Sequence, residues 1–134
     1  MRDKIFIDSN VALYLIDDIN KRKREIALDV VSLIPFISPQ VIFECLNVCL
    51  KKYKLGREIS FRFIEFLMKS TLIQSETESV VVTAISLFKK YSLQPFDSKI
   101  IASALLSECS VLYSEDMQSG LVVNNSLTIV NPFL

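Results

Sequence analysis

Residues 5–11, Ile-Phe-Ile-Asp-Ser-Asn-Val, join an apolar run to an acidic residue and then to a second apolar pattern. Lys4 to Ile7 is predicted to form a short strand, and the pattern from Asn10 to about Ile19 predicts a helix. Helix capping alone would explain one aspartate at such a junction, Asp8. The rest of the sequence decides whether this residue does more.

The alternation of short apolar strands and helices continues along the chain. Further strands are predicted at Phe36–Ile37, Thr71–Gln74, Val111–Tyr113 and Leu127–Val130. Further helices are predicted at Lys21–Ile34, Pro39–Lys54 with Ser38 as N-cap, Ile59–Lys69, Glu76–Tyr91 and Pro95–Leu106. Because the strands are apolar throughout, they indicate a parallel sheet covered on both faces. We predict one α/β domain over residues 1–134, a three-layer α/β/α sandwich with a short-stranded parallel sheet.

Composition excludes several kinds of chemistry. The 134 residues include no histidine and only two glycines. Without histidine, Ser–His and Cys–His nucleophilic catalysis and every histidine-ligated metal site are excluded. Two glycines leave no Gly-rich phosphate loop. Any catalysis must therefore rest on carboxylates, hydroxyls, lysines or a metal held by oxygen ligands.

The apolar content predicts a partner surface and not a membrane contact. Hydrophobic residues make up 51% of the chain and charged residues 22%, but no apolar run approaches the ~18 residues of a membrane span. No signal-peptide pattern is present, and an odd number of cysteines, three, then predicts reduced thiols in the cytoplasm. The apolar excess points to a large core and an exposed interface.

Acidic residues directly follow two of the predicted strands. Asp8 follows the first strand, and Ser114, Glu115 and Asp116 follow Val111–Tyr113. In open α/β sheets, ligands bind beyond the carboxyl ends of the strands, where the strand order reverses. If these two strands are neighbours at that point, their acids meet in one crevice.

Two further acids, Glu44 and Asp97, lie on predicted helices. Asp97 shares a helix face with apolar residues, which fits either a helix cap or an acid that faces a cleft. Glu44 lies on a narrow polar stripe of a largely apolar helix, which fits either a solvated face or the wall of a cleft. Periodicity does not choose between these alternatives.

Four stretches together resemble the PIN-domain family of metal-dependent ribonucleases. They are IFIDSNV at 5–11, ISPQVIFECLNV at 37–48, PFDSKIIASAL at 95–105 and LYSEDMQSG at 112–120. Their order, their spacing and the total length agree with the family over nearly the whole chain. Within the family, the chain is most similar to VapC-type toxins of bacterial type II toxin–antitoxin pairs.

The resemblance implies a catalytic and metal-binding site built from Asp8, Glu44, Asp97 and Asp116, with supporting roles for Ser9, Asn10 and Ser114. Asp116 is preferred to Glu115 because it matches the Ser/Thr-x-Asp spacing of the family. Physical chemistry supports the same site, because carboxylates in one crevice repel one another unless a cation neutralises them. Oxygen ligands without histidine or cysteine suit Mg²⁺ or Mn²⁺.

The expected function is metal-dependent endoribonuclease activity on RNA phosphodiester bonds, as the toxin of a toxin–antitoxin pair. RNA as the substrate comes from the family alone. The basic clusters Lys21–Arg24 and Lys51–Arg57 are candidates for contacts to flanking phosphates, although solvated helix faces explain them too. The apolar helices from Lys21 to Lys69 are expected to pair with an antitoxin helix, with a second copy in a homodimer, or with both.

Three alternative functions compete with this one. A phosphoacceptor receiver domain requires a lysine after the last strand, where this chain has Asn131 and Pro132, and it is disfavoured. A non-enzymatic protein-binding module, whose acids are caps and surface charges, remains open. A PIN-domain RNA-processing nuclease without an antitoxin also remains open.

Overall fold

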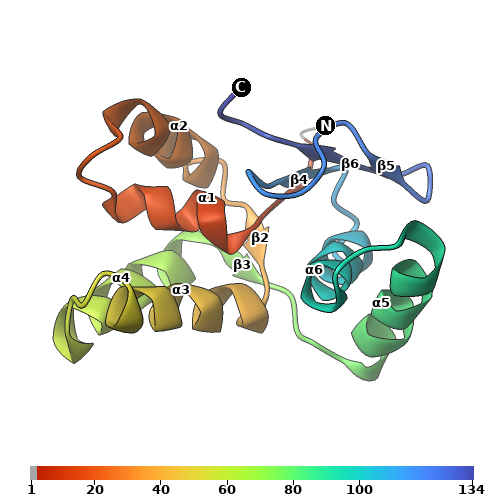
Figure 1. Cartoon of the computed structure of the whole chain (residues 1–134), viewed down its shortest axis with the longest axis horizontal. Helices are drawn as coiled ribbons and strands as arrows, with labels where there is room; N and C mark the ends of the chain where they lie inside the picture. The colour runs from red at the N-terminus through yellow and green to blue at the C-terminus, as the bar shows by residue number, and fades with distance from the viewer. Residues whose placement is uncertain (1–2) are drawn as a thin grey trace.

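The computed structural model describes residues 3–134, which form a six-stranded sheet with helices on both faces (Figure 1). The strand order is β3-β2-β1-β4-β6-β5, and every neighbouring pair is parallel except β5 and β6. The strands are β1 (Ile5–Ile7), β2 (Phe36–Ile37), β3 (Leu72–Ile73), β4 (Val111–Tyr113), β5 (Val122–Val123) and β6 (Leu127–Val130). The predicted strands are confirmed, with β1 and β3 slightly shorter than expected.

The sheet is mixed and not parallel throughout, because β5 pairs antiparallel with β6. The sequence pattern did not predict this strand. This two-residue strand folds back on β6 through a tight turn at Asn124 and Asn125, whose φ angles are 49° and 56°. Asparagine tolerates this left-handed region better than most residues. Two consecutive asparagines between short apolar runs were therefore the available signal for a hairpin.

The helices form the two outer layers of the sandwich. Figure 1 shows α1 to α4 gathered on one side of the sheet and α5 and α6 on the other. This separation follows from right-handed crossovers, because the chain moves from β1 to β3 in one direction and then returns across the sheet to β4. The helices are α1 (Ser9–Leu13), α2 (Lys21–Val31), α3 (Pro39–Lys51), α4 (Arg57–Ser70), α5 (Glu78–Tyr91) and α6 (Pro95–Leu106). The predicted three-layer α/β/α arrangement is confirmed.

Local side-chain chemistry sets where the helices begin and end. The Ser38 hydroxyl accepts a hydrogen bond from the backbone N–H of Val41, and Pro39 occupies the first turn of α3, as predicted. The helix predicted from Asn10 to Ile19 is shorter than expected, because α1 gives way to a 3₁₀ turn at Tyr14–Ile16. Asp17 then accepts hydrogen bonds from two backbone N–H groups that follow it, which closes a turn in place of a further helical turn.

The strand order reverses between β1 and β4, at the centre of the sheet. The two strands pair in parallel with Ile7 opposite Tyr113, and Phe6, Ile7 and Leu112 are fully buried. The chain leaves β1 for β2 and later returns to β4 on the other side of β1. The backbone N–H of Asp8 donates to the Tyr113 carbonyl at 3.0 Å. The residues that follow these two strands therefore emerge side by side.

Large apolar side chains are exposed on the helices of both outer layers. Phe43 on α3 and Phe61 and Phe66 on α4 are exposed, which confirms the predicted apolar surface on that helical arm. Val82 and Ile85 on α5 are exposed as well, and this second apolar face was not predicted. No helix within residues 3–134 is both long enough and apolar enough to cross a membrane.

We expect the buried side chain of Leu112, on the central strand β4, to contribute strongly to the free energy of unfolding. Leu112→Ala should lower the free energy of unfolding by about 2–5 kcal/mol, because it leaves a cavity where a fully buried side chain was. Leu28→Ala, at a position that is 44% exposed, is the matched control and should cost less than about 1 kcal/mol. Urea denaturation of both variants measures the difference, and equal losses would contradict the placement of Leu112 in the core.

Candidate functional site

Asp8 lies at the centre of a hydrogen-bond network that joins the ends of β1 and β4. The backbone N–H of Ser9 donates to one carboxylate oxygen of Asp8 at 2.8 Å. The Ser114 hydroxyl donates to the other oxygen at 2.9 Å, and the Asn10 side-chain amide donates to the same oxygen at 3.3 Å. These donors fix the orientation of the buried Asp8 carboxylate without supplying a positive charge.

Asn10 connects the first turn of α1 to the loop after β4. Its side-chain nitrogen also donates to the Asp116 carboxylate at 3.2 Å, and its side-chain oxygen accepts from the backbone N–H of Glu115 at 3.0 Å. The same nitrogen lies 3.4 Å from the Ser114 hydroxyl. One amide therefore bridges the carboxylates of Asp8 and Asp116, a geometry that fits the supporting role predicted for it.

The two acids after Ser114 face in different directions. Asp116 is exposed and accepts from Asn10, whereas Glu115 accepts from the Tyr14 hydroxyl at 2.6 Å and from the Lys23 ammonium. Partial burial works to raise the pKa of Glu115, but the hydrogen bonds from Lys23 and Tyr14 outweigh it, and the pKa is lowered. The acid that turns toward Asp8 is therefore Asp116, in agreement with the preference drawn from spacing.

Asp97 lies in the first turn of α6, and it does not cap the helix. The N-cap position is occupied by Gln94, and no side chain makes a capping bond there. Asp97 is half-buried, and burial followed by the charge of Asp116 raises the pKa of its carboxyl. Of the two alternatives that the sequence left open, the structure favours an acid that faces a cleft.

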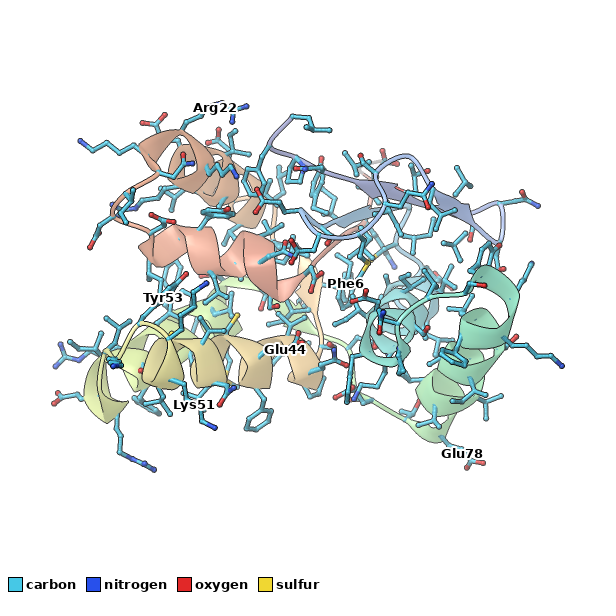
Figure 2. The ribbon with its side chains drawn as sticks, viewed as in Figure 1. Phe6, Arg22, Glu44, Lys51, Tyr53 and Glu78 are labelled. Carbon is cyan, nitrogen blue, oxygen red and sulfur yellow. The ribbon has the colours of Figure 1, made fainter. Side chains whose placement is uncertain are left out.

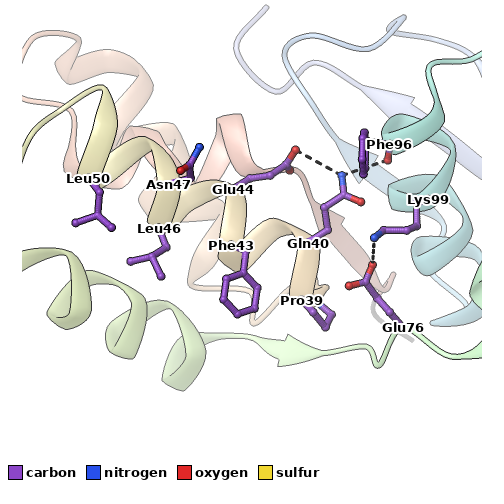
Figure 3. Close-up of a pocket in the computed structure, with 10 residues that line it drawn as sticks. All are labelled: Pro39, Gln40, Phe43, Glu44, Leu46, Asn47, Leu50, Glu76, Phe96 and Lys99. Atoms are coloured by element: carbon purple, nitrogen blue, oxygen red, sulfur yellow. Dashed lines mark hydrogen bonds and ion pairs between the residues drawn. The ribbon is translucent and has the colours of Figure 1, made fainter. Parts of the chain in front are cut away.

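Glu44 lies on α3 (Figure 2), and its side chain is half-buried. Burial raises the pKa of its carboxyl most strongly, and the charge of Asp97 raises it further. The Gln40 side-chain amide reaches the Glu44 carboxylate at 3.5 Å and also donates to the Phe96 carbonyl at 3.3 Å, across to α6 (Figure 3). Glu44 is therefore part of the wall of a cleft between α3 and α6.

The four predicted acids act on one another electrostatically. The pKa of Asp8 is raised to about 6, mainly by burial and also by the charges of Glu44 and Asp97, against the hydrogen bonds from Ser114 and Ser9. Within residues 3–134, none of the four acids belongs to an ion pair. The four carboxylates, Asp8, Glu44, Asp97 and Asp116, thus form an acid cluster without an ion-pair partner, and Lys99, whose charge works to lower the raised pKa of Glu44, is itself paired with Glu76.

The donor set of the acid cluster fits a hard divalent cation. All four donors are carboxylates, and Mg²⁺ and Mn²⁺ prefer oxygen ligands. In the part of the chain that the structure describes, no three acidic or thiol side chains converge tightly enough to enclose a metal ion. Without a bound cation, neighbouring carboxylates raise one another's pKa.

Two hollows flank the acid cluster. One, of about 430 Å³, adjoins Asn10 and Asp116 and is lined by Lys52 and Tyr53 from the end of α3. The other, of about 730 Å³, adjoins Glu44 on the side toward α6 (Figure 3). Of the two basic clusters singled out in the sequence, the second therefore contributes a lysine beside the site.

Two residues of the first basic cluster make contacts within the protein. Lys23 is engaged by Glu115, and a guanidinium nitrogen of Arg22 donates to the Phe133 carbonyl at 2.7 Å. The Lys23 ammonium also lies 5.0 Å from the ring centroid of Tyr14 and 5.5 Å from that of Phe133. Tyr14 and Phe133 carried no sequence signal, because these contacts join residues far apart in the chain.

The comparisons with known proteins agree with this fold. The family model of the PIN domain matches residues 5–119, and no curated protein matches the sequence. A toxin–antitoxin complex from Klebsiella pneumoniae has a chain of similar structure, with a TM-score of 0.71 and 19% identity over 96% of this chain and 97% of that one. DNA-bound VapBC from Salmonella typhimurium gives a TM-score of 0.70 and 16% identity over 96% and 97% of the two chains.

A third similar structure is Mycobacterium tuberculosis VapC20, a toxin that cleaves the sarcin–ricin loop. Its TM-score is 0.68, with 14% identity over 84% of this chain and 90% of that one. At such low identities these structures establish a shared fold. The family match covers most of the chain and includes the ends of β1 and β4, where the acid cluster lies. The chain belongs to the PIN-domain family.

Proposed function

We propose that residues 1–134 form a single nuclease domain, an endoribonuclease that hydrolyses RNA phosphodiester bonds with Mg²⁺ or Mn²⁺. The observation that carries this proposal is the acid cluster, whose carboxylates lie near the point where the strand order reverses and form no ion pair among the described residues. Structural caps and surface charges would not require a buried aspartate with a pKa raised to about 6. RNA as the substrate rests on membership of the family.

The four carboxylates would hold one or two divalent cations. A bound cation lowers the pKa of water and offsets the charge that develops on phosphorus-bound oxygens. Ser114 and the backbone of Ser9 orient Asp8, and Asn10 holds Asp116 on the same side. Lys52 and Tyr53, in the hollow beside Asp116, lie where they can contact a phosphate and a base of the substrate.

An antitoxin is the partner that we propose for the helical arm of α3 and α4. A mostly apolar hollow of about 350 Å³ lies between these helices and is lined by Leu46, Leu50, Arg57, Phe61 and Ile64. An amphipathic antitoxin helix would fill such a groove. A basic side chain from it would reach the acid cluster and supply the cation that the free protein lacks. Similar structures include two toxin–antitoxin complexes.

A homodimer and a cytoplasmic location complete the proposal. The exposed apolar face of α5, which includes Val82, Ile85 and Phe88, is separate from the helical arm and is available to a second copy. The three cysteines are buried and free, as in proteins of a reducing compartment. A non-enzymatic binding module of the same fold would have no need of divalent cations, so metal binding separates it from the proposed nuclease.

Asp8→Asn should abolish the proposed cleavage. Loss of one negative ligand from the acid cluster is expected to lower the Mn²⁺-dependent rate by about 100-fold or more, by analogy with the loss of other charge-stabilising groups. The measurement is cleavage of a fluorescently labelled single-stranded RNA with and without Mn²⁺. The matched control is Asp29→Asn, at an exposed position of α2 outside the acid cluster. Full activity of the Asp8 variant would overturn the role given to Asp8.

The same substitution should raise the stability of the metal-free protein in a pH-dependent manner. Folding raises the pKa of Asp8 from 3.8 to about 6, so the folded state binds this proton more tightly than the unfolded state. The free energy of unfolding of the wild type should therefore fall by about 2–3 kcal/mol in total as the pH rises from about 4 to about 6. Asp8→Asn removes this loss, so its advantage should be absent below pH 4 and complete above pH 6. Chemical denaturation of both proteins in EDTA across this pH range tests the prediction. A stability difference between Asp8→Asn and the wild type that does not change with pH would contradict it.

The two apolar faces should respond separately to substitution. Phe61→Ser, on the helical arm, should weaken binding of the protein encoded by the neighbouring gene by about tenfold or more and leave self-association unchanged. Phe88→Ser, on α5, should have the opposite pattern. Calorimetry and light scattering measure the two properties. A strictly monomeric wild type that binds no such protein would overturn the partner proposal but leave the nuclease proposal standing, as an RNA-processing enzyme without an antitoxin.

A further inference from the structure

The loop after β4 is held at Glu115 from two sides. Its backbone N–H donates to the Asn10 side chain at 3.0 Å, on the side of the acid cluster. Its carboxylate accepts from the Tyr14 hydroxyl at 2.6 Å and from the Lys23 ammonium, on the side of α2. Because Asp116 is the next residue, these contacts restrain the backbone from which its side chain extends.

Lys23 is the centre of this attachment. Its ammonium donates to both the Glu115 carboxylate and the Tyr14 hydroxyl, the latter at 3.2 Å, and it lies near the faces of the Tyr14 and Phe133 rings. The two rings pack edge to face with their centroids 4.8 Å apart. The side chains of Lys23 and Glu115 are only 26% and 23% exposed, so their attraction is screened less than that of a surface pair. We call Tyr14, Lys23, Glu115 and Phe133 the lysine clamp.

We propose that Lys23 is a positioning residue, which holds Glu115 outside the acid cluster so that Asp116 alone completes it. The inference rests on the proposed function in one respect, the binding of a divalent cation by the acid cluster. Lys23 itself contacts none of the four acids. It acts through Glu115 and the backbone of the loop.

The positive charge of Lys23 holds the Glu115 carboxylate on the side of α2. Without it, the Glu115 carboxylate would keep only one neutral donor, the Tyr14 hydroxyl. A carboxylate without a cation, one residue from Asp116, would then compete with Asp116 for the Asn10 amide and for any bound metal. The loop would gain a second arrangement, and the arrangement that presents Asp116 would lose population.

The test compares Lys23→Met with Lys23→Arg, which restores the charge. In metal-free, isotope-labelled protein, Lys23→Met should shift the side-chain amide resonances of Asn10, and Lys23→Arg should return them toward the wild-type positions. In titrations with Mn²⁺, Lys23→Met should weaken binding by about tenfold, in the range typical of lost outer-shell partners. Glu115→Gln should weaken it to a similar degree, and the double variant should be no worse than either single variant.

The control is Lys4→Met, which breaks an exposed ion pair with Glu108 at the opposite end of β1. It should change neither the Asn10 resonances nor Mn²⁺ affinity. A lower melting temperature for Lys23→Met with unchanged Asn10 resonances would show a purely structural role and overturn the proposal. Unchanged Asn10 resonances and Mn²⁺ affinity with weaker RNA binding would make Lys23 a phosphate contact instead. If the wild type binds no Mn²⁺, the proposed function fails, and the metal-free resonances still decide whether the lysine clamp positions the loop.

Discussion

The parallel pairing of β1 with β4 is the constraint on which the rest of the site depends. It places Asp8 beside Ser114, so that a hydroxyl from one strand end orients a carboxylate from the other at 2.9 Å. Asn10 then has Asp116 within reach and joins the two acids. The crossovers that follow from this strand order bring α3 and α6 to the same end of the sheet, and with them Glu44 and Asp97.

The acid cluster lowers the stability of the free protein, and it provides carboxylates that could bind a cation. Asp8 is almost fully buried, and its three hydrogen-bond donors are neutral. A structural role would be met as well by an uncharged residue at this position. Asp8 also caps α1 by accepting from the Ser9 N–H, but asparagine or serine would cap the helix without a buried charge. A bound metal ion or a basic side chain of a partner would offset that charge. The same uncompensated charge thus explains both the proposed catalysis and the proposed mode of neutralisation.

Several features could be predicted because they depend on short segments. Ser38 and Pro39 specify the start of α3 wherever it packs, and apolar runs such as Val111–Tyr113 specify buried strands. Other features could not be predicted in this way. Whether Glu44 faces solvent or a cleft depends on α6, which lies about fifty residues further along the chain. The two-residue strand β5 is too short to show a period, and it is defined by its pairing with β6.

The sequence by itself determined the order of the strands and helices along the chain except β5, the absence of histidine chemistry and the four acids that resemble a PIN-domain site. These properties depend on residue type and local spacing. The tertiary structure decided which acids face one another, that Asp116 and not Glu115 turns toward Asp8, and that Lys23 serves the loop after β4. Such choices are set by contacts between residues 92 and 106 positions apart, because only the folded sheet brings the ends of β1 and β4 and the flank of α2 together.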